Sequence, residues 1–365
     1  MKINFIGGLK TVMSNRDSMH NYFGWPTSAR LKNGKIAVGA SGFRLGHVCP
    51  FGKSVISYSD DDGETYTAPA AVIDTVLDDR DAGLCPFGDN GLIFTSFNNT
   101  VEFQRKTNQK RADFTKKAYI DAYLDNITKE AEQKALGNTY RISNDNGTSW
   151  GPILKSPITS PHGPIELRGG SILWVGTSYQ NGYDDITAYE INTANGKMEY
   201  AGKIDTSSIK ALGRIPSEPY AIELDNGIIL CHIRADHYDE SSAFTLYQSE
   251  SSDGGKTWSE PIQILEDRGG APSHLLKHSS GVLIATYGYR DLPYGIKVMF
   301  SYDGGKSWSE GKYIYSNDIS WDLGYPSTVE LRDGSLLTIF YASPYATPDN
   351  EGGAVILGQK WSFEK

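Results

Sequence analysis

The chain is poor in cysteine and has no long apolar run. Its three cysteines, Cys49, Cys85 and Cys231, are odd in number and have no metal-ligand spacing, so we interpret them as buried thiols and expect neither a metal nor a cofactor. No apolar run reaches membrane-spanning length, and the first residues lack the long apolar core and small-residue cleavage site of a signal peptide. These absences predict a cytoplasmic protein with no membrane partner, or a secreted one if a leader was removed.

An excess of basic residues is also absent. The formal net charge is −9 and Lys and Arg are scattered, which argues against a nucleic-acid partner. The abundant residues include 39 glycines and 22 tyrosines, a composition typical of a turn-rich β protein. A length of 365 residues allows two domains, but β-propellers of this size often form one.

A short motif, S-x-D-x-G-x-[ST]-[WY], occurs four times, as SDDDGETY, SNDNGTSW, SSDGGKTW and SYDGGKSW. The Asp side chain can accept hydrogen bonds from the backbone just ahead of it, and Gly takes the positive φ that the turn needs. The motif therefore predicts a hairpin, not catalysis. We expect its aspartates to lie at outer turns, far from any active site: Asp61, Asp145, Asp253 and Asp303.

A longer repeat surrounds these motifs. Six times an apolar strand ends in a Gly-bearing turn and leads into another apolar strand, from WPTSARLKNGKIAVGASG near the start to YPSTVELRDGSLLTIFYA near the end. Six β-hairpins at this period predict six blades. We therefore expect an all-β fold, a single six-bladed β-propeller domain over residues 1–365.

One segment breaks the β pattern. Residues 101–137 are rich in Lys, Glu, Ala and Gln, and Ala118, Ala122 and Ile127 recur at helical intervals. We predict a helical insertion of one or two helices in blade two. It could be a solvated excursion, a lid over the site, or a contact through which the protein forms a homo-oligomer.

Propeller geometry brings the six hairpins together at one mouth of the central channel. Inner strands start there, and the next strands return there. The residues at the strand starts are Trp25, Asp81, His162, Glu218, Ser273 with His274, and Tyr325. Those at the returning ends are Arg44, Asn98, Tyr179, Arg234, Arg290 and Tyr341. Because packing does not require such a polar ring, it is the predicted site.

The chain resembles the sialidase (neuraminidase) superfamily in three features. These are the four copies of the short motif, which is known as the Asp box, the six predicted blades, and the ordered set Glu218, Arg234, Arg290 and Tyr325. The resemblance covers nearly the whole chain apart from the helical insertion. It implies an exo-glycosidase that releases a terminal sialic or related ulosonic acid with retention of configuration. It also implies the roles of four residues: Tyr325 as nucleophile, Glu218 as its base, and Arg234 and Arg290 as ligands of the substrate carboxylate. A phenol with a pKa near 10 needs such a base at neutral pH.

The sequence departs from the family pattern in its third carboxylate-binding arginine. Sialidases open blade one with an Arg in a Phe-Arg-Ile-Pro setting, whereas this chain has Trp25 in the stretch FGWP. We expect Arg44, or else Arg80, to replace it, because a guanidinium can bind a carboxylate bidentately from either place. Trp25 itself could stack on a sugar face or simply line the channel.

The general acid is the second departure. The family has an Asp on the loop after the first hairpin, but here that loop reads FRLGHVCPFG and has no carboxylate. Asp81 is our candidate and His47 is its competitor; a self-paired surface turn would also explain the DDRD run that contains Asp81. We expect His162 to contact a sugar hydroxyl or to be structural, and His232 and His278 to be structural.

Two alternatives to a sialidase remain open at this point. An exo-glycosidase for a sugar without an anomeric carboxylate would suit Trp25 in place of Arg. A non-catalytic glycan-binding propeller is the other, although binding alone requires no phenol and carboxylate side by side.

Overall fold

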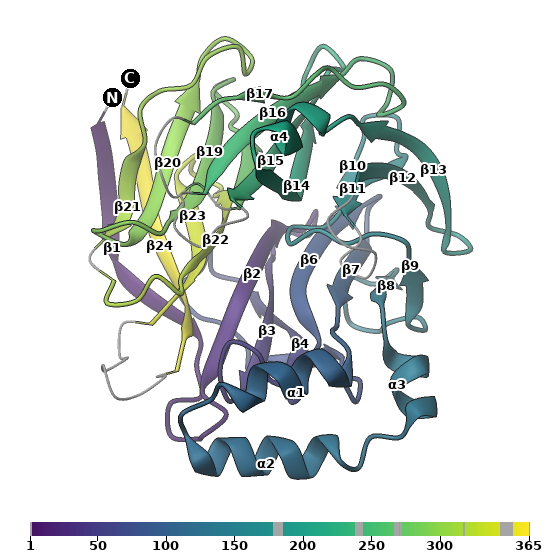
Figure 1. Ribbon diagram of the computed structural model, residues 1–365. Coiled ribbons are helices and arrows are strands. Elements are labelled where there is room, and N and C mark those ends of the chain that lie inside the picture. Colours follow the sequence, from purple (N-terminus) through teal and green to yellow (C-terminus); the bar gives the residue numbers. More distant parts are fainter. Residues whose placement is uncertain are drawn as a thin grey trace.

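The computed structural model describes residues 2–177, 185–237, 244–265, 270, 272–316, 318–343 and 353–364. The strands in these ranges form six four-stranded antiparallel sheets arranged as blades around a central channel (Figure 1). This arrangement confirms the predicted all-β six-bladed β-propeller.

The blades follow one another in chain order, and in blades one to five the strands run outward from the channel in sequence order. Blade one contains β2 (Tyr22–Arg30), β3 (Ile36–Arg44), β4 (Lys53–Ser59) and β5 (Ala70–Ile73). Blade two contains β6 (Arg80–Phe87), β7 (Gly91–Phe97), β8 (Asn138–Ser143) and β9 (Leu154–Ser156). Blade three contains β10 (Ile165–Glu166), β11 (Ile172–Thr177), β12 (Ile186–Asn192) and β13 (Lys197–Ile204).

Blades four and five repeat this pattern, and blade six uses both ends of the chain. Blade four contains β14 (Arg214–Glu223), β15 (Ile229–His237), β16 (Thr245–Ser251) and β17 (Ile262–Gln263). Blade five contains β18 (Ser273–Lys277), β19 (Leu283–Tyr289), β20 (Gly295–Ser301) and β21 (Lys312–Ser316). Blade six contains β22 (Gly324–Glu330), β23 (Leu336–Ala342), β24 (Val355–Glu364) and, as its outer strand, β1 (Lys2–Met13).

The pairing of β1 with β24 closes the ring. The two strands are antiparallel, from Lys2 opposite Glu364 to Met13 opposite Ile356. The two ends of the chain therefore lie side by side (Figure 1). Hydrophobic side chains pack between neighbouring blades as well as within them; Val38 of blade one, for example, shares a core cluster with Leu337 and Ile339 of blade six.

The four Asp-box aspartates lie between the third and fourth strands of their blades, at the outer turns where they were predicted. In the first box, Asp61 Oδ1 accepts hydrogen bonds from Ser59 Oγ at 2.8 Å and from Thr65 N at 2.9 Å. The Ser59 hydroxyl in turn accepts from Gly63 N at 2.8 Å. The other three boxes repeat the bonds to the Ser hydroxyl and to the backbone. The motif is therefore a structural staple of the hairpin.

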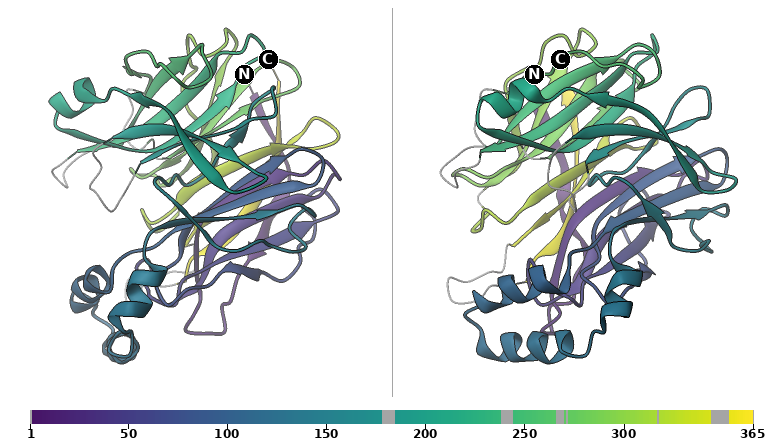
Figure 2. Two further views of the ribbon diagram at one scale, coloured as in Figure 1. Left: turned by 90° about the vertical axis from the view of Figure 1, so that its right-hand side faces the viewer. Right: turned by 45° about the vertical axis from the view of Figure 1, so that its right-hand side comes forward.

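The insertion between β7 and β8 forms three helices, α1 (Val101–Gln109), α2 (Phe114–Leu124) and α3 (Lys129–Ala135), instead of the one or two predicted. Side-chain N-caps at Thr100, Asp113 and Thr128 separate them, because each caps the amides of a new first turn. Ala118 and Ala122 are exposed, and α2 buries Ile120 and Leu124 instead. The helices project together from one side of the propeller (Figure 2).

Asn98 anchors this insertion. Its Nδ2 donates to the Ala135 carbonyl at 3.1 Å and its Oδ1 accepts from Gly137 N at 2.8 Å.

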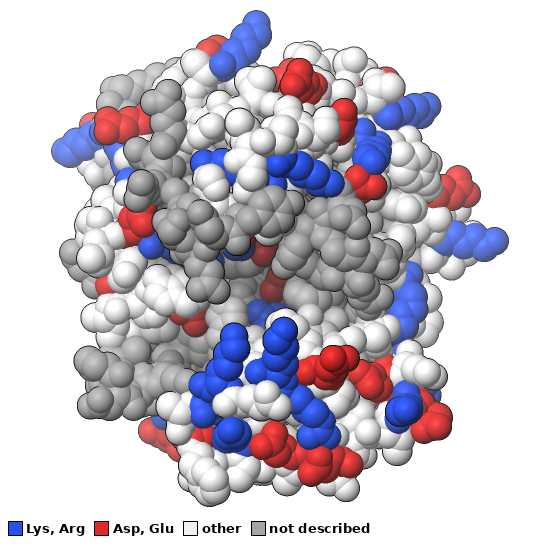
Figure 3. Space-filling model, viewed as in Figure 1, with Lys and Arg blue, Asp and Glu red and all other residues white. Residues whose placement is uncertain are grey.

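Side chains of both charge signs intermingle over α1 and α2 (Figure 3). A fourth helix, α4 (Ser207–Ala211), precedes β14. Within the described ranges, none of the helices has the length and apolar character needed to cross a membrane.

Candidate active site

Four side chains reach the channel mouth from equivalent backbone positions. Trp25, Asp81, Glu218 and Tyr325 have φ angles of 52°, 48°, 48° and 48°, in the left-handed region that non-glycine residues rarely adopt. Each lies where the pairing between the first and second strands of its blade is interrupted. Such a bulge re-aims a side chain, and backbone strain of this kind concentrates at functional sites.

In blade three the corresponding residue is Gly163, with a φ of 82°, and it precedes a proline as three of the four residues above do. The predicted position of His162 is thus one residue out of register. Its Nδ1 lies 3.0 Å from the Thr27 hydroxyl, and its ring packs edge-on against His274 at 5.1 Å between centroids. Burial holds the pKa of His162 well below its usual range. A neutral, fully buried imidazole inside the channel favours the structural role over a sugar contact.

Tyr325, Glu218 and Arg234 form a hydrogen-bonded cluster. The Tyr325 hydroxyl donates to Glu218 Oε1 at 2.6 Å. Arg234 Nη1 donates to Glu218 Oε2 at 2.6 Å and to the Tyr325 oxygen at 3.2 Å. The three residues come from blades four and six, so the structure brings together the phenol, carboxylate and guanidinium that the sequence pattern grouped.

Asp236, which was not predicted, holds Arg234 in place. Its two carboxylate oxygens accept from Arg234 Nε and Nη2, each at 2.8 Å. The two residues are i and i+2 on β15, so their side chains share one face of the strand. That alternation, Arg-Ala-Asp, is the signal that could have identified Asp236. The fork geometry leaves Arg234 Nη1 directed at Tyr325 and Glu218.

Burial raises the pKa of Tyr325 well above its usual value, and the Glu218 carboxylate raises it further, whereas Arg234 opposes both effects. In the resting state the phenol is therefore protonated. It requires proton transfer to Glu218 before its oxygen can become a strong nucleophile, and Arg234 is placed to stabilise the resulting negative charge.

Asp81 lies beside this cluster and is almost fully buried. Burial raises the pKa of its carboxyl to about 7; the charge of Glu218 adds to the rise and that of Arg80 opposes it. Asp81 Oδ1 is buried and finds no hydrogen-bond partner within the part of the chain that the structure describes. A carboxyl group that is partly protonated at neutral pH is what a general acid requires.

Arg44 and Arg80 both lie against the Trp25 ring, and Arg80 also interacts electrostatically with Tyr325. Both pair with the fully buried Asp78, Arg44 at 2.5 Å and Arg80 at 3.4 Å. Their guanidinium carbons lie 4.7 and 4.0 Å from the centre of the Trp25 ring. Gln104 of α1 donates to Asp78 at 3.0 Å, so the insertion supports the pair. Arg44 is 0% exposed, which speaks against direct contact with a substrate carboxylate. The DDRD run is thus partly self-paired, but it is buried and not a surface turn.

Arg290 makes hydrogen bonds to neutral oxygens. Its Nε donates to the Leu323 carbonyl at 3.1 Å and its Nη2 to the Tyr341 hydroxyl at 3.3 Å. Within the described ranges it has no ion pair with a carboxylate. Its guanidinium carbon lies 5.8 Å from the centres of both the Tyr325 and Trp321 rings. Arg290 is therefore available to a ligand above Tyr325.

Asp322 is a second unpredicted member of the site. It accepts from the hydroxyls of Tyr22 and Tyr341, each at 2.8 Å, and lies 3.0 Å from His47 Nδ1. Burial opposes its ionisation, but His47 and the Tyr22 hydroxyl lower the pKa of Asp322 overall. The His47 side chain is 40% exposed, so an oriented imidazole faces solvent at the mouth. An acidic residue three positions before Tyr325 was the available signal.

The remaining predicted residues have structural partners. His232 lies 3.0 Å from Ser273 Oγ, and His278 lies 2.9 Å from the Gly334 carbonyl. Tyr179 lies outside the described residues. All three cysteines are buried and free, as predicted. Among the residues that the structure describes, no cluster of His, Cys, Asp or Glu is arranged to hold a metal ion.

Comparisons with solved structures show the same architecture. A protein of unknown function from Dyadobacter fermentans is 20% identical with a TM-score of 0.74, over 98% of this chain and 100% of that one. The intramolecular trans-sialidase from Ruminococcus gnavus is 14% identical with a TM-score of 0.64, over 96% of each chain. The NanB sialidase from Streptococcus pneumoniae is 14% identical with a TM-score of 0.66, over 97% of this chain and 70% of that one.

Comparison by sequence supports the repeat assignment. A search of curated proteins found no match. The family model of the BNR repeat-like domain matches residues 123–338, more than half of the chain. The chain therefore belongs to the BNR repeat-like domain family, and its fold is the six-bladed propeller seen in sialidases.

Proposed function

We propose that this protein is a retaining exo-glycosidase that uses Tyr325 as its nucleophile. The observation that supports this most strongly is the 2.6 Å hydrogen bond from the Tyr325 hydroxyl to Glu218, with Arg234 Nη1 3.2 Å from the same phenol oxygen. Glycan binding alone does not require a buried phenol and carboxylate paired in this way. This is the arrangement of an activated nucleophile, its base, and a cation that stabilises the phenolate.

The reaction proceeds in two steps. In the first, the Tyr325 oxygen bonds to the anomeric carbon while its proton passes to Glu218, and Asp81 donates a proton to the departing glycosidic oxygen. In the second, Asp81 as a carboxylate takes a proton from water, and the water oxygen attacks the anomeric carbon. The Tyr325 oxygen leaves and recovers its proton from Glu218. Two displacements at one carbon retain its configuration.

The charges around the site favour a sugar without an anomeric carboxylate. The site has four arginines and an equal number of closely placed carboxylates. Arg44 and Arg80 pair with Asp78, and Arg234 pairs with Glu218 and Asp236. Asp322 pairs with His47. Trp25 occupies the position at which the sialidase pattern has the third carboxylate-binding arginine. Arg44 and Arg80, the two candidates to replace that arginine, are both paired with Asp78. A site with so little uncompensated positive charge is poorly suited to an ulosonic acid.

A sialic or related ulosonic acid, the first expectation from the sequence, is the second candidate. Arg290 beside Tyr325 supports it, because this guanidinium has no carboxylate ion pair within the described residues. The deciding experiment is hydrolysis of a panel of aryl glycosides that includes sialosides, with wild-type protein and Tyr325→Phe in parallel. Turnover of one member that is lost in Tyr325→Phe supports the enzyme. Turnover that Tyr325→Phe retains in full would overturn the nucleophile, and no turnover of any member by the wild-type protein would favour a glycan-binding propeller.

A further inference from the structure

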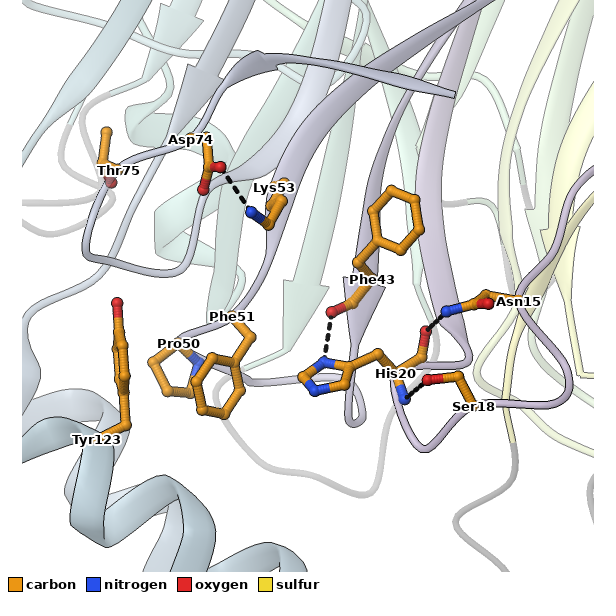
Figure 4. A pocket seen from close by; sticks show the side chains of 10 residues that line it. All are labelled: Asn15, Ser18, His20, Phe43, Pro50, Phe51, Lys53, Asp74, Thr75 and Tyr123. Carbon is orange, nitrogen blue, oxygen red and sulfur yellow. Dashed lines mark hydrogen bonds and ion pairs between the residues drawn. The ribbon is translucent and has the colours of Figure 1, made fainter. Parts of the chain in front are cut away.

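We propose that the pocket between the helical insertion and blade one is a second glycan-binding site, which holds a neutral sugar unit of the substrate away from Tyr325. The pocket has a volume of about 460 Å³, within the range of small-molecule sites (Figure 4). This inference rests on the proposed function only in taking a glycan as the ligand.

The pocket opens on the same face as the candidate active site. Its walls are loops that join strand ends at the channel mouth, the adjoining ends of β3 and β4, and Tyr123 of α2. Residues 45–52, between β3 and β4, separate the two places: His47 contacts Asp322, whereas Phe51 lines the pocket. These two residues are four apart, so their Cα atoms are at most about 14 Å from each other. One oligosaccharide could therefore reach both places.

Aromatic rings form the apolar part of the pocket. Phe51 packs against Tyr123 at 4.7 Å between ring centroids, and edge-on against His20 at 5.3 Å. Figure 4 shows these rings, with Phe43, along the pocket. Flat apolar surfaces interrupted by a few polar groups are the usual lining of a ligand site, and the C–H faces of a sugar ring match them.

The polar groups of the pocket suit hydroxyls and not a charge. Lys53 and Asp74 pair at 2.6 Å, and their side chains are 39% and 44% exposed, so the pocket has one cation balanced by one anion. His20 Nδ1 lies 2.9 Å from the Phe43 carbonyl, which can only accept, so Nδ1 donates this hydrogen bond. Donors and acceptors without net charge indicate a neutral saccharide.

This arrangement also gives the insertion a role. Ile120 and Leu124 of α2 pack against Leu45 and Cys49 of the loop, which holds Tyr123 over the pocket. The wall that Tyr123 supplies would be missing from a propeller without these helices.

The test is saturation-transfer NMR of the wild-type protein with cellotetraose, maltotetraose, xylotetraose and laminaritetraose, and with trigalacturonate as the anionic comparison. We expect transfer from at least one neutral tetrasaccharide, weakened at least tenfold in Tyr123→Ala and retained in Tyr123→Phe. Phe114→Ala is the matched control, because Phe114 starts the same helix, is 80% exposed and does not line the pocket. Since the readout is binding, it is independent of whether Tyr325 is a nucleophile.

A second variant covers the case in which Tyr123→Ala disturbs the helix. Ser18 lines the pocket, and the native cysteines are buried, so Ser18→Cys can be labelled selectively with a bulky maleimide. The label should abolish transfer, whereas unlabelled Ser18→Cys should keep it. Lack of transfer from every neutral tetrasaccharide, preference for trigalacturonate, or transfer that survives the label would overturn the inference.

Discussion

The Tyr325 hydroxyl lies 2.6 Å from Glu218 Oε1, although 107 residues separate the two in the chain. Both side chains leave a strained, left-handed backbone position in the first strand of their blades. Blades four and six thus use the same local backbone feature, and the closed ring turns the two side chains toward each other. Four predictions follow from this site and its surroundings.

Removal of the Tyr325 hydroxyl should abolish catalysis without unfolding the protein. We expect Tyr325→Phe to reduce kcat on the responsive aryl glycoside by about 10³-fold or more, and Glu218→Gln by roughly 10²–10⁴-fold, because nucleophile and base act as a unit. Tyr315→Phe is the control, since its hydroxyl bonds Asp318 outside the cluster. Rates and melting temperatures are measured together; full activity of Tyr325→Phe would end the mechanism.

Asp81 should act as the general acid, with His47 as its competitor. Its pKa of about 7 predicts that kcat/KM falls as pH rises through 7, because the proton to be donated is then lost. Asp81→Asn should abolish hydrolysis of glycosides with poor leaving groups. With dinitrophenyl glycosides, whose departure needs no acid, it should spare the first step, seen as a burst of dinitrophenolate, but slow the second step, in which Asp81 acts as the base. If His47→Gln shows this pattern and Asp81→Asn does not, the assignment passes to His47.

Asp81 should also make the protein less stable as pH rises. Its carboxyl has an ordinary pKa of 3.8 and a folded pKa of about 7. Between these values the unfolded chain releases a proton that the folded chain keeps, so the free energy of unfolding falls with increasing pH. Asp81→Asn should remove part of this slope in urea unfolding between pH 4 and 7. Burial raises the pKa of Asp79 to about 7 as well, so Asp79→Asn should remove a similar part. An unchanged slope in both variants would contradict the assignment.

The substrate should lack an anomeric carboxylate. A carboxylate left without its full set of cations costs about 2–5 kcal/mol, so we expect a neutral aryl glycoside to be hydrolysed at least about 30-fold faster than an aryl sialoside. The comparison uses kcat/KM at one pH. Faster hydrolysis of the sialoside, lost in Arg290→Ala, would instead establish the ulosonic acid.

Local patterns made the fold predictable. The Asp boxes use hydrogen bonds within seven residues, and the hairpins need only Gly-bearing turns between apolar strands, so both can be read from short stretches. The repeat period then indicated six blades. The inner ends of the strands identified Glu218, Tyr325, Arg234 and Arg290, because a regular repeat places equivalent residues at equivalent depths.

Tertiary structure decided what depends on contacts between distant segments. Sequence could not show that Arg44 and Arg80 pair with Asp78 beside Trp25, because a buried ion pair depends on which side chains lose contact with water together. Sequence reasoning also missed Asp322, because its place in the site depends on contacts with Tyr22, His47 and Tyr341, which are distant from one another in the chain. The sequence determined a six-bladed propeller with a Tyr and Glu at its mouth. The packing of the blades decided which arginines can meet a ligand, because burial and charge pairing are properties of the assembled ring.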